Sequence, residues 1–230
     1  MTKARELTIR QQLFAWQDIK YRDFAKRLLP QTEKLIGVRL PLIDKYARQL
    51  VSSRGKECCC IIPADYFEET MLEAMLISYL PLSLEEKLHC LGRFVPKITN
   101  WSICDSLCIR LKFAEQNRSA VWEFLHPFFE STHEYELRFA FVMALNYFLL
   151  PEYLDKVFER VAQFKSHKFY AQTAVAWLLS LAFIKFSKET WLFLENCSLD
   201  DETFAKTLQK IRESRQISPK VKKEIRKLKR

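Results

Sequence analysis

The chain has 230 residues, of which 49% are apolar and only three are glycine, so it is long enough to bury a sizeable core. No stretch approaches the roughly 18 uncharged apolar residues of a membrane-spanning helix, and the amino terminus lacks an apolar signal core, which argues against a membrane or secreted protein. Seven cysteines, an odd number whose spacing matches no zinc site, predict reduced thiols in a cytoplasmic protein.

The formal net charge of +9 comes from the carboxyl-terminal end. Residues 206–230 carry eleven Lys and Arg against two Glu, whereas acidic and basic residues balance over the rest of the chain. Such a segment suits phosphate groups, but it suits equally a solvated helix whose cations complement the helix dipole. Charge alone therefore leaves nucleic-acid binding open.

Amphipathic periodicity, punctuated by eight prolines, predicts helices along the whole chain and little sheet. In chain order the predicted helices span residues 4–18, 20–29, 41–53, 64–79, 83–94, 100–115, 118–130, 134–149, 151–164, 168–186, 188–196, 201–214 and 218–229. Their connections are short, which favours antiparallel helix pairs stacked in an array over a closed bundle. Because no Pro/Gly/Ser-rich linker divides them, we expect a single all-α domain over 1–230 that ends in the basic segment 206–230.

The predicted helix 134–149 carries a regular apolar stripe that should be buried. Its members are Leu137, Phe141, Ala144, Leu145 and Phe148. Arg138 lies beside this stripe among apolar neighbours, and it must reach an anion or the solvent, because burying an unpaired guanidinium is too costly. The predicted helix 168–186 is apolar nearly all round, as in an inner helix with neighbours on both sides. Trp177 within it therefore belongs either to the core or to a groove.

Three conspicuous side chains recur at the spacing of a helical repeat. Trp101, Arg138 and Trp177 are separated by 37 and 39 residues, close to the period of about 40–47 residues in HEAT and armadillo helix pairs. Residues one repeat apart occupy equivalent places on successive helices, and Asp105 follows Trp101 by one turn on the same helical face. The pattern predicts a HEAT-like helical-repeat solenoid in which two indoles, a guanidinium and a carboxylate line one concave wall.

Three short segments carry a resemblance to a known family. They are Asn100-Trp-Ser-Ile-Cys-Asp105, Leu137-Arg138-Phe-Ala and Ala174-Val-Ala-Trp177. Together they resemble the AlkD-like DNA alkylation repair family, whose Trp-x-x-x-Asp motif, Arg-containing helix start and second groove tryptophan they match in order. The resemblance covers most of the chain, from Tyr21-Arg-Asp-Phe-Ala onward. It implies an all-helical array of HEAT-like repeats curved around a DNA-binding groove.

The resemblance also implies a monofunctional DNA glycosylase that removes positively charged alkylated purines from double-stranded DNA. Such a base is already a good leaving group, so Asp105 would stabilise the developing oxocarbenium sugar and place a water. Trp101 and Trp177 would pack on the lesion nucleotide, where a cation–π contact is worth about 0.5–2 kcal/mol, and Arg138 would hold a nearby phosphate. The chemistry requires no metal or organic cofactor, and no heptad seam predicts association beyond a monomer.

Each of these residues also has an ordinary structural interpretation. Trp101 would then be a core or interface anchor, and the apolar helix around Trp177 would bury it. The two charged residues have potential ion-pair partners in the sequence. These partners are Arg110 or Lys112 for Asp105, and Glu134 for Arg138.

Three positions depart from the pattern of the active glycosylases. Asn100 stands where they carry an aromatic residue, Ser180 replaces a basic residue, and Pro30 interrupts the second helix, with which they grip DNA. Two other functions therefore stay open. One is a catalytically silent relative that binds DNA by its shape or structure, and the other is a helical-repeat scaffold that binds a protein partner in its concave face.

Overall fold

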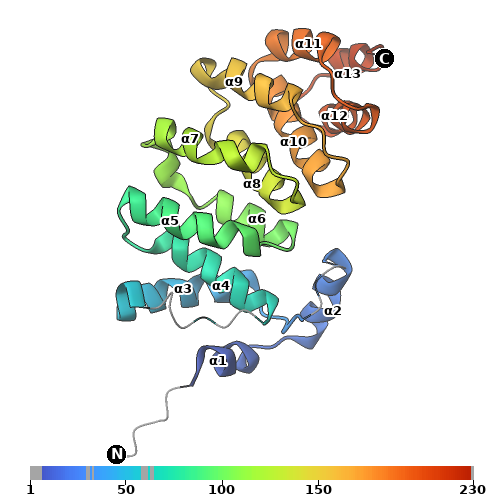
Figure 1. Cartoon of the computed structure of the whole chain (residues 1–230). Coiled ribbons are helices and arrows are strands. Elements are labelled where there is room, and N and C mark those ends of the chain that lie inside the picture. Colours follow the sequence, from blue (N-terminus) through green and yellow to red (C-terminus); the bar gives the residue numbers. More distant parts are fainter. Residues whose placement is uncertain (1–6, 30–31, 33, 58–61, 63–64, 229–230) are drawn as a thin grey trace, which may run out of the picture. The chain divides into compact units, whose positions relative to one another are not determined.

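The computed structural model describes residues 7–29, 32, 34–57, 62 and 65–228. Regular structure within these ranges is helical, with thirteen α-helices joined by short turns (Figure 1). The all-α class and the helix-pair packing expected of a helical-repeat protein are thereby confirmed. The contacts divide the chain into two compact units, unit 1 (residues 1–111) and unit 2 (residues 112–230). The expectation of a single domain stays a prediction.

Unit 1 is built around one central helix. Its helices are α1 (Ile9–Ala15), α2 (Ile19–Leu28), α3 (Leu40–Arg54), α4 (Phe67–Tyr79), α5 (Leu84–Phe94) and α6 (Trp101–Cys108). α4 packs against α3, α5 and α6, and its apolar residues Met71, Leu72 and Leu76 are fully buried. α2 buries only Ala25, so it contributes little to this core.

Unit 2 also has an inner helix, with neighbours on more than one side. Its helices are α7 (Arg118–Phe129), α8 (Glu134–Tyr147), α9 (Pro151–Ala162), α10 (Phe169–Lys185), α11 (Ser187–Asn196), α12 (Asp201–Glu213) and α13 (Pro219–Ile225). α10 packs against α8, α11 and α12, which explains its nearly uniform apolar sequence. The stripe predicted on α8, from Leu137 to Phe148, is buried at all five positions, so that prediction is confirmed.

Two predicted helices are wrong in extent. Within the described residues, α1 covers only Ile9–Ala15 of the predicted helix 4–18. The sequence predicts a helix over 100–115, but α6 ends at Cys108 and a separate 3-10 helix covers Lys112–Glu115. The backbone N–H groups of Arg110 and Leu111 bond three residues back, to Leu107 and Cys108, which tightens the last turn and ends the α-helix. The predicted interruption at Pro30 and the cysteines at 58–60 lie outside the described residues.

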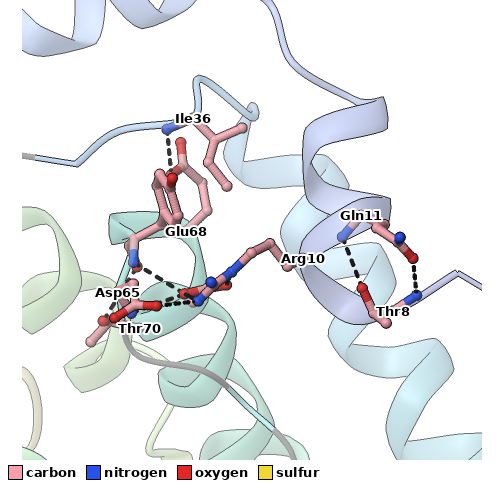
Figure 2. Close-up of polar contacts among 9 residues, drawn as sticks. Thr8, Arg10, Gln11, Ile36, Asp65, Glu68 and Thr70 are labelled. Carbon is pink, nitrogen blue, oxygen red and sulfur yellow. Dashed lines mark hydrogen bonds and ion pairs between the residues drawn. The ribbon is translucent and has the colours of Figure 1, made fainter.

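A buried carboxylate ties the segment before α3 to α4. The Glu68 side chain, 0% exposed, accepts hydrogen bonds from the backbone N–H groups of Ile36 at 2.9 Å, Gly37 at 2.7 Å and Val38 at 3.1 Å. The next residue, Glu69, pairs with Arg10 of α1. Figure 2 shows the Glu68 carboxylate directed toward the backbone N–H of Ile36, and the Arg10 side chain extending toward Asp65. Two successive acids thus anchor two different segments to α4.

We expect alanine in place of Gly37 to destabilise the segment whose N–H groups bond to Glu68. We call this set of three hydrogen bonds the Glu68 cradle. Its φ of +100° is in the region that favours glycine, and an added Cβ would lie 2.5 Å from Cβ of Arg22 and 2.7 Å from the carbonyl oxygen of Asp18. We expect Gly37→Ala to lower the free energy of unfolding by about 1–3 kcal/mol, measured by urea denaturation. Gly55→Ala is the control, because its φ is also positive but nothing lies within 4 Å of its added Cβ. Equal costs at both positions would contradict the role of crowding.

Candidate functional site

α6 presents a buried face and an open face. The buried face consists of Ile103, Cys104, Leu107 and Cys108. Trp101 and Asp105 are half-buried on the opposite side, followed by Ile109, which is 59% exposed. Because the two faces alternate with the period of the helix, the indole and the carboxylate lie one turn apart above the core of unit 1.

The start of α6 is fixed by Asn100, which is 3% exposed. Its Oδ1 accepts the backbone N–H of Ile103 at 3.1 Å, so Asn100 is the N-cap of the helix. Trp101, the first residue of the helix, donates from Nε1 to the carbonyl oxygen of Leu28 at 3.3 Å. The indole is thereby held at its edge by the last residue of α2.

We expect Asn100→Ala to destabilise the protein by about 1 kcal/mol, because the cap of α6 is lost. Nδ2 of Asn100 is buried without a hydrogen-bond partner among the described residues, so Asn100→Ser, which keeps an acceptor and removes this donor, should cost less. Thermal denaturation of both variants tests the order. An equally stable Asn100→Ala variant would show that the cap does not hold the first turn of α6.

Arg110, one of two potential ion-pair partners of Asp105 in the sequence, pairs with Asp44 in the structure. Arg110 donates from Nε to Oδ1 of Asp44 at 3.1 Å and from Nη1 to the carbonyl oxygen of Ser106 at 2.7 Å. Its guanidinium thus points to α3 and not to Asp105. Asp105 itself is half-buried on the side of α6 that carries Trp101.

In unit 2, α10 has a similar open strip. Tyr170, Thr173, Trp177 and Leu181 are half-buried at helical spacing, while most of the helix is buried. Trp177 thus belongs to the partly exposed strip, and its apolar helix has not fully buried it. Ser180, which stands where the glycosylase pattern has a basic residue, is 5% exposed and donates to the carbonyl oxygen of Trp177 at 2.8 Å.

Arg138 is a residue of α8, is 4% exposed and contacts the first turn of α10. Its Nη1 donates to the carbonyl oxygen of Tyr170 at 2.9 Å, while the N–H of Tyr170 donates to Oε1 of Glu134 at 2.6 Å. The sequence predicts that this guanidinium reaches an anion or the solvent, and the structure adds the neutral carbonyl oxygen of Tyr170 as one of its acceptors. Arg138 and Glu134 together hold the first turn of α10.

Two tyrosines at this place were missed in the sequence. The ring of Tyr135 stacks on that of Tyr170, with centroids 5.6 Å apart and an interplanar angle of 29°. Tyr135 precedes Arg138 by one turn, and Tyr170 precedes Trp177 by two turns, so the helical period could have found both. The adjacent Phe169 is 57% exposed. Aromatic surface therefore surrounds the point where Arg138 meets α10.

The basic segment 206–230 contacts the start of α10 through its first residue. Nζ of Lys206 lies 5.2 Å from the ring centroid of Phe169 and donates to Oε1 of Gln172 at 3.0 Å. Lys206 also lowers the pKa of the exposed Glu202 carboxyl through their hydrogen bond. Further along the segment, Lys220, Lys223 and several other cations are exposed, so part of the segment is a solvated positive surface.

α2 in unit 1 adds an unusual surface of its own. Phe24 and Leu28 are each 49% exposed, and Lys20, Lys26 and Arg27 on the same helix are exposed as well. Such a mixture of cations and apolar side chains suits a partner that offers both phosphates and flat apolar groups.

Among the residues that the structure describes, no three His, Cys, Asp or Glu side chains are grouped so that they could hold a metal ion. None of the helices in the described ranges is long and apolar enough to cross a membrane. The structure thus brings Trp101 together with Asp105 in unit 1, and Arg138 together with the helix of Trp177 in unit 2.

The sequence was compared with known proteins. A family model described as DNA alkylation repair enzyme matches residues 9–216, a range that contains all four predicted site residues. The matched range ends before α13. A search of curated proteins found no match.

Proposed function

On the premise that this chain belongs to the family of DNA alkylation repair enzymes, we propose that it is a DNA N-glycosylase for cationic alkylated purines, of the 3-methyladenine or 7-methylguanine type. Its role in DNA repair follows from the family. The observation that carries the finer proposal is the open face of α6, where Trp101 and Asp105 stand one turn apart above a buried core. An aromatic ring beside a carboxylate suits a cationic base and a cationic sugar.

Asp105 performs the chemical role in this proposal. Alkylation at N3 or N7 gives the purine a positive charge, so the bond from C1′ to the base nitrogen breaks and the base leaves with the electron pair. The carboxylate stabilises the oxocarbenium sugar that develops and orients a water, whose oxygen bonds to C1′ as its proton is lost to solvent.

Each of the two tryptophans offers an indole face to the DNA in this proposal. Trp101 is held at its indole N–H edge by Leu28, which fixes the ring plane while the base stacks on a ring face. Trp177 offers a second indole on the half-buried strip of α10, two turns after Tyr170. Cation–π attraction of about 0.5–2 kcal/mol per ring favours the charged base over its neutral parent.

Arg138 positions the DNA backbone in the same proposal. Because Tyr170 holds the guanidinium at 2.9 Å, a phosphate would meet a preoriented donor and would lose little side-chain entropy on binding. This contact would place the phosphate beside the Tyr135–Tyr170 stack. The partner is duplex DNA, bound by a monomer.

A specific observation also favours the catalytically silent relative. Asn100 is a buried helix cap and Ser180 is buried against the backbone of α10, so neither supplies the groove contact that the active glycosylases make there. A silent relative would bind duplex or branched DNA without releasing a base. The exposed apolar side chains of α2 are the corresponding argument for a protein-binding scaffold.

Release of free 3-methyladenine and 7-methylguanine from methylated duplex DNA in low salt tests the proposal. We expect release by the full chain, and binding that weakens steeply as salt rises. Salt-sensitive DNA binding without release would overturn the glycosylase in favour of the silent relative. If neither base release nor DNA binding were observed, the protein-binding scaffold would remain. Its apolar interface would respond little to salt.

A further inference from the structure

A second cluster of cations lies in unit 1, apart from the open face of α6. Asp44 and Arg48 are on α3, Tyr79 ends α4, and Arg110 follows α6. Arg110 is therefore at the opposite end of α6 from Trp101. With Lys45, Leu40 and Pro41, three of these residues line a pocket of about 410 Å³.

One carboxylate orients both guanidinium groups of this pocket. Oδ1 of Asp44 accepts from Nε of Arg110 at 3.1 Å and from the Tyr79 hydroxyl at 2.5 Å, and its Oδ2 accepts from Nε of Arg48 at 3.0 Å. Arg48 also donates from Nη2 to the Tyr79 hydroxyl at 2.8 Å and lies over the Tyr79 ring at 4.1 Å. The two arginines are thus fixed by a shared set of partners.

Each arginine has one terminal nitrogen that could donate to a ligand. Nη1 of Arg48 and Nη2 of Arg110 have no hydrogen-bond partner within the described ranges. The side chain of Arg48 is 62% exposed and that of Arg110 25% exposed. Lys45 beside them is exposed and has no ion-pair partner in the same ranges. Three cations therefore face one carboxylate, and donors remain unused.

The negative charge of Asp44 is stabilised by its hydrogen-bond partners in the pocket. Partial burial raises the pKa of its carboxyl, but hydrogen bonds from Tyr79, Arg48 and Arg110 outweigh burial and hold the pKa below its usual range. Asp44 is therefore a carboxylate at neutral pH and compensates one of the three positive charges. The remaining charge of the pocket is positive.

We infer that this pocket binds a phosphate group, by the donors of Arg48 and Arg110 and the charge of Lys45. Planar guanidinium groups held at fixed angles match the oxygens of phosphate, and Lys45 adds a mobile point charge. Only the source of the phosphate, the backbone of DNA, rests on the proposed function; the affinity of the pocket for phosphate does not. The pocket would extend the DNA contact beyond the open face of α6.

Inorganic phosphate is the first probe, with the full chain and NMR detection of the arginine Nε–Hε signals. We expect saturable shifts of the Arg48 and Arg110 signals with sodium phosphate, and none with sodium chloride at equal ionic strength. Arg93 on α5 is the internal control, because it is exposed and outside this pocket. Equal, unsaturated shifts of all three signals would mean an adventitious ion only and would overturn the inference.

Duplex DNA is the second probe, with binding measured over a range of salt. Arg48→Gln should weaken binding several-fold and reduce the slope of log K against log salt by about 1, the value of one phosphate contact. Arg48→Lys should restore the slope but not the full affinity, because it keeps the charge and loses the fork. Lys45→Gln repeats the test at an exposed residue that has no ion-pair partner among the described residues, and Arg93→Gln should leave the slope unchanged.

The binding experiments, together with the base-release assay, distinguish the phosphate pocket from the proposed glycosylase activity. Phosphate binding and a reduced slope without base release would support the pocket and contradict the enzyme. Base release with an unchanged slope in Arg48→Gln and Lys45→Gln would support the enzyme and overturn the pocket as a DNA contact.

Discussion

Asp105→Asn is expected to reduce base release by about 10²–10⁴-fold, the range of a lost electrostatic or general-base contribution. Asn has the shape of Asp without its charge, so it does not stabilise the oxocarbenium sugar and orients the attacking water less well. Asp105 is half-buried on the open face of α6, so the substitution leaves the core intact. Single-turnover release of 7-methylguanine from methylated duplex measures the effect.

The control for this experiment is a second acid-to-amide change in unit 1. Glu85→Gln on α5 removes the same charge from an exposed position, and its release rate should equal that of the wild type. DNA affinity should be the same in all three proteins. If Asp105→Asn released base at the wild-type rate, Asp105 would have no role in bond cleavage. If it lost DNA binding and stability together, its role would be structural.

The open faces of α6 and α10 show what periodicity alone can predict. Trp101 and Asp105 were placed on one face because they are one turn apart, and the structure has them on the half-buried side of α6. Most helices also followed from amphipathic stripes and proline positions, although the predicted helices 4–18 and 100–115 were too long. Such features are local, since they depend on residues within a few turns of one another.

Partners far apart in the sequence could not be predicted in the same way. Arg110 bonds Asp44 across 66 residues, and Arg138 bonds the carbonyl of Tyr170 across 32 residues. A sequence shows which charges are present, but a backbone carbonyl is present at every residue and leaves no sequence signal. Arg110 was for this reason considered only as a potential partner of the nearby Asp105, whereas it pairs with the distant Asp44.

The Glu68 cradle is another contact between residues far apart in the sequence. In the sequence Glu68 and Glu69 look like the acids that favour the first turn of a helix. In the structure both are 0% exposed, and Glu68 binds three successive backbone N–H groups about 30 residues earlier. Only the glycine at position 37 was a local indication that the backbone there is unusual.

Glu68→Gln is expected to lower the free energy of unfolding by about 3 kcal/mol or more. The carboxylate has two oxygens for three N–H donors, whereas the amide of Gln has one oxygen and an NH₂ group that would face another donor. A buried donor without an acceptor costs about 1–3 kcal/mol, and the charged acceptor is lost as well. Because Gln is nearly isosteric with Glu, the loss reports hydrogen bonding and charge more than volume.

Urea denaturation and backbone hydrogen exchange measure this loss at two levels. The N–H groups of Ile36, Gly37 and Val38 should exchange faster in Glu68→Gln, because opening of this segment no longer breaks bonds to a carboxylate. Glu73→Gln is the matched control, since Glu73 lies on the same helix and pairs with Lys97 at 2.7 Å with its side chain 14% exposed. That pair is partly solvated and should be worth about 1 kcal/mol or less. Equal midpoints and equal exchange in the two variants would show that the cradle does not anchor α4 to the segment before α3.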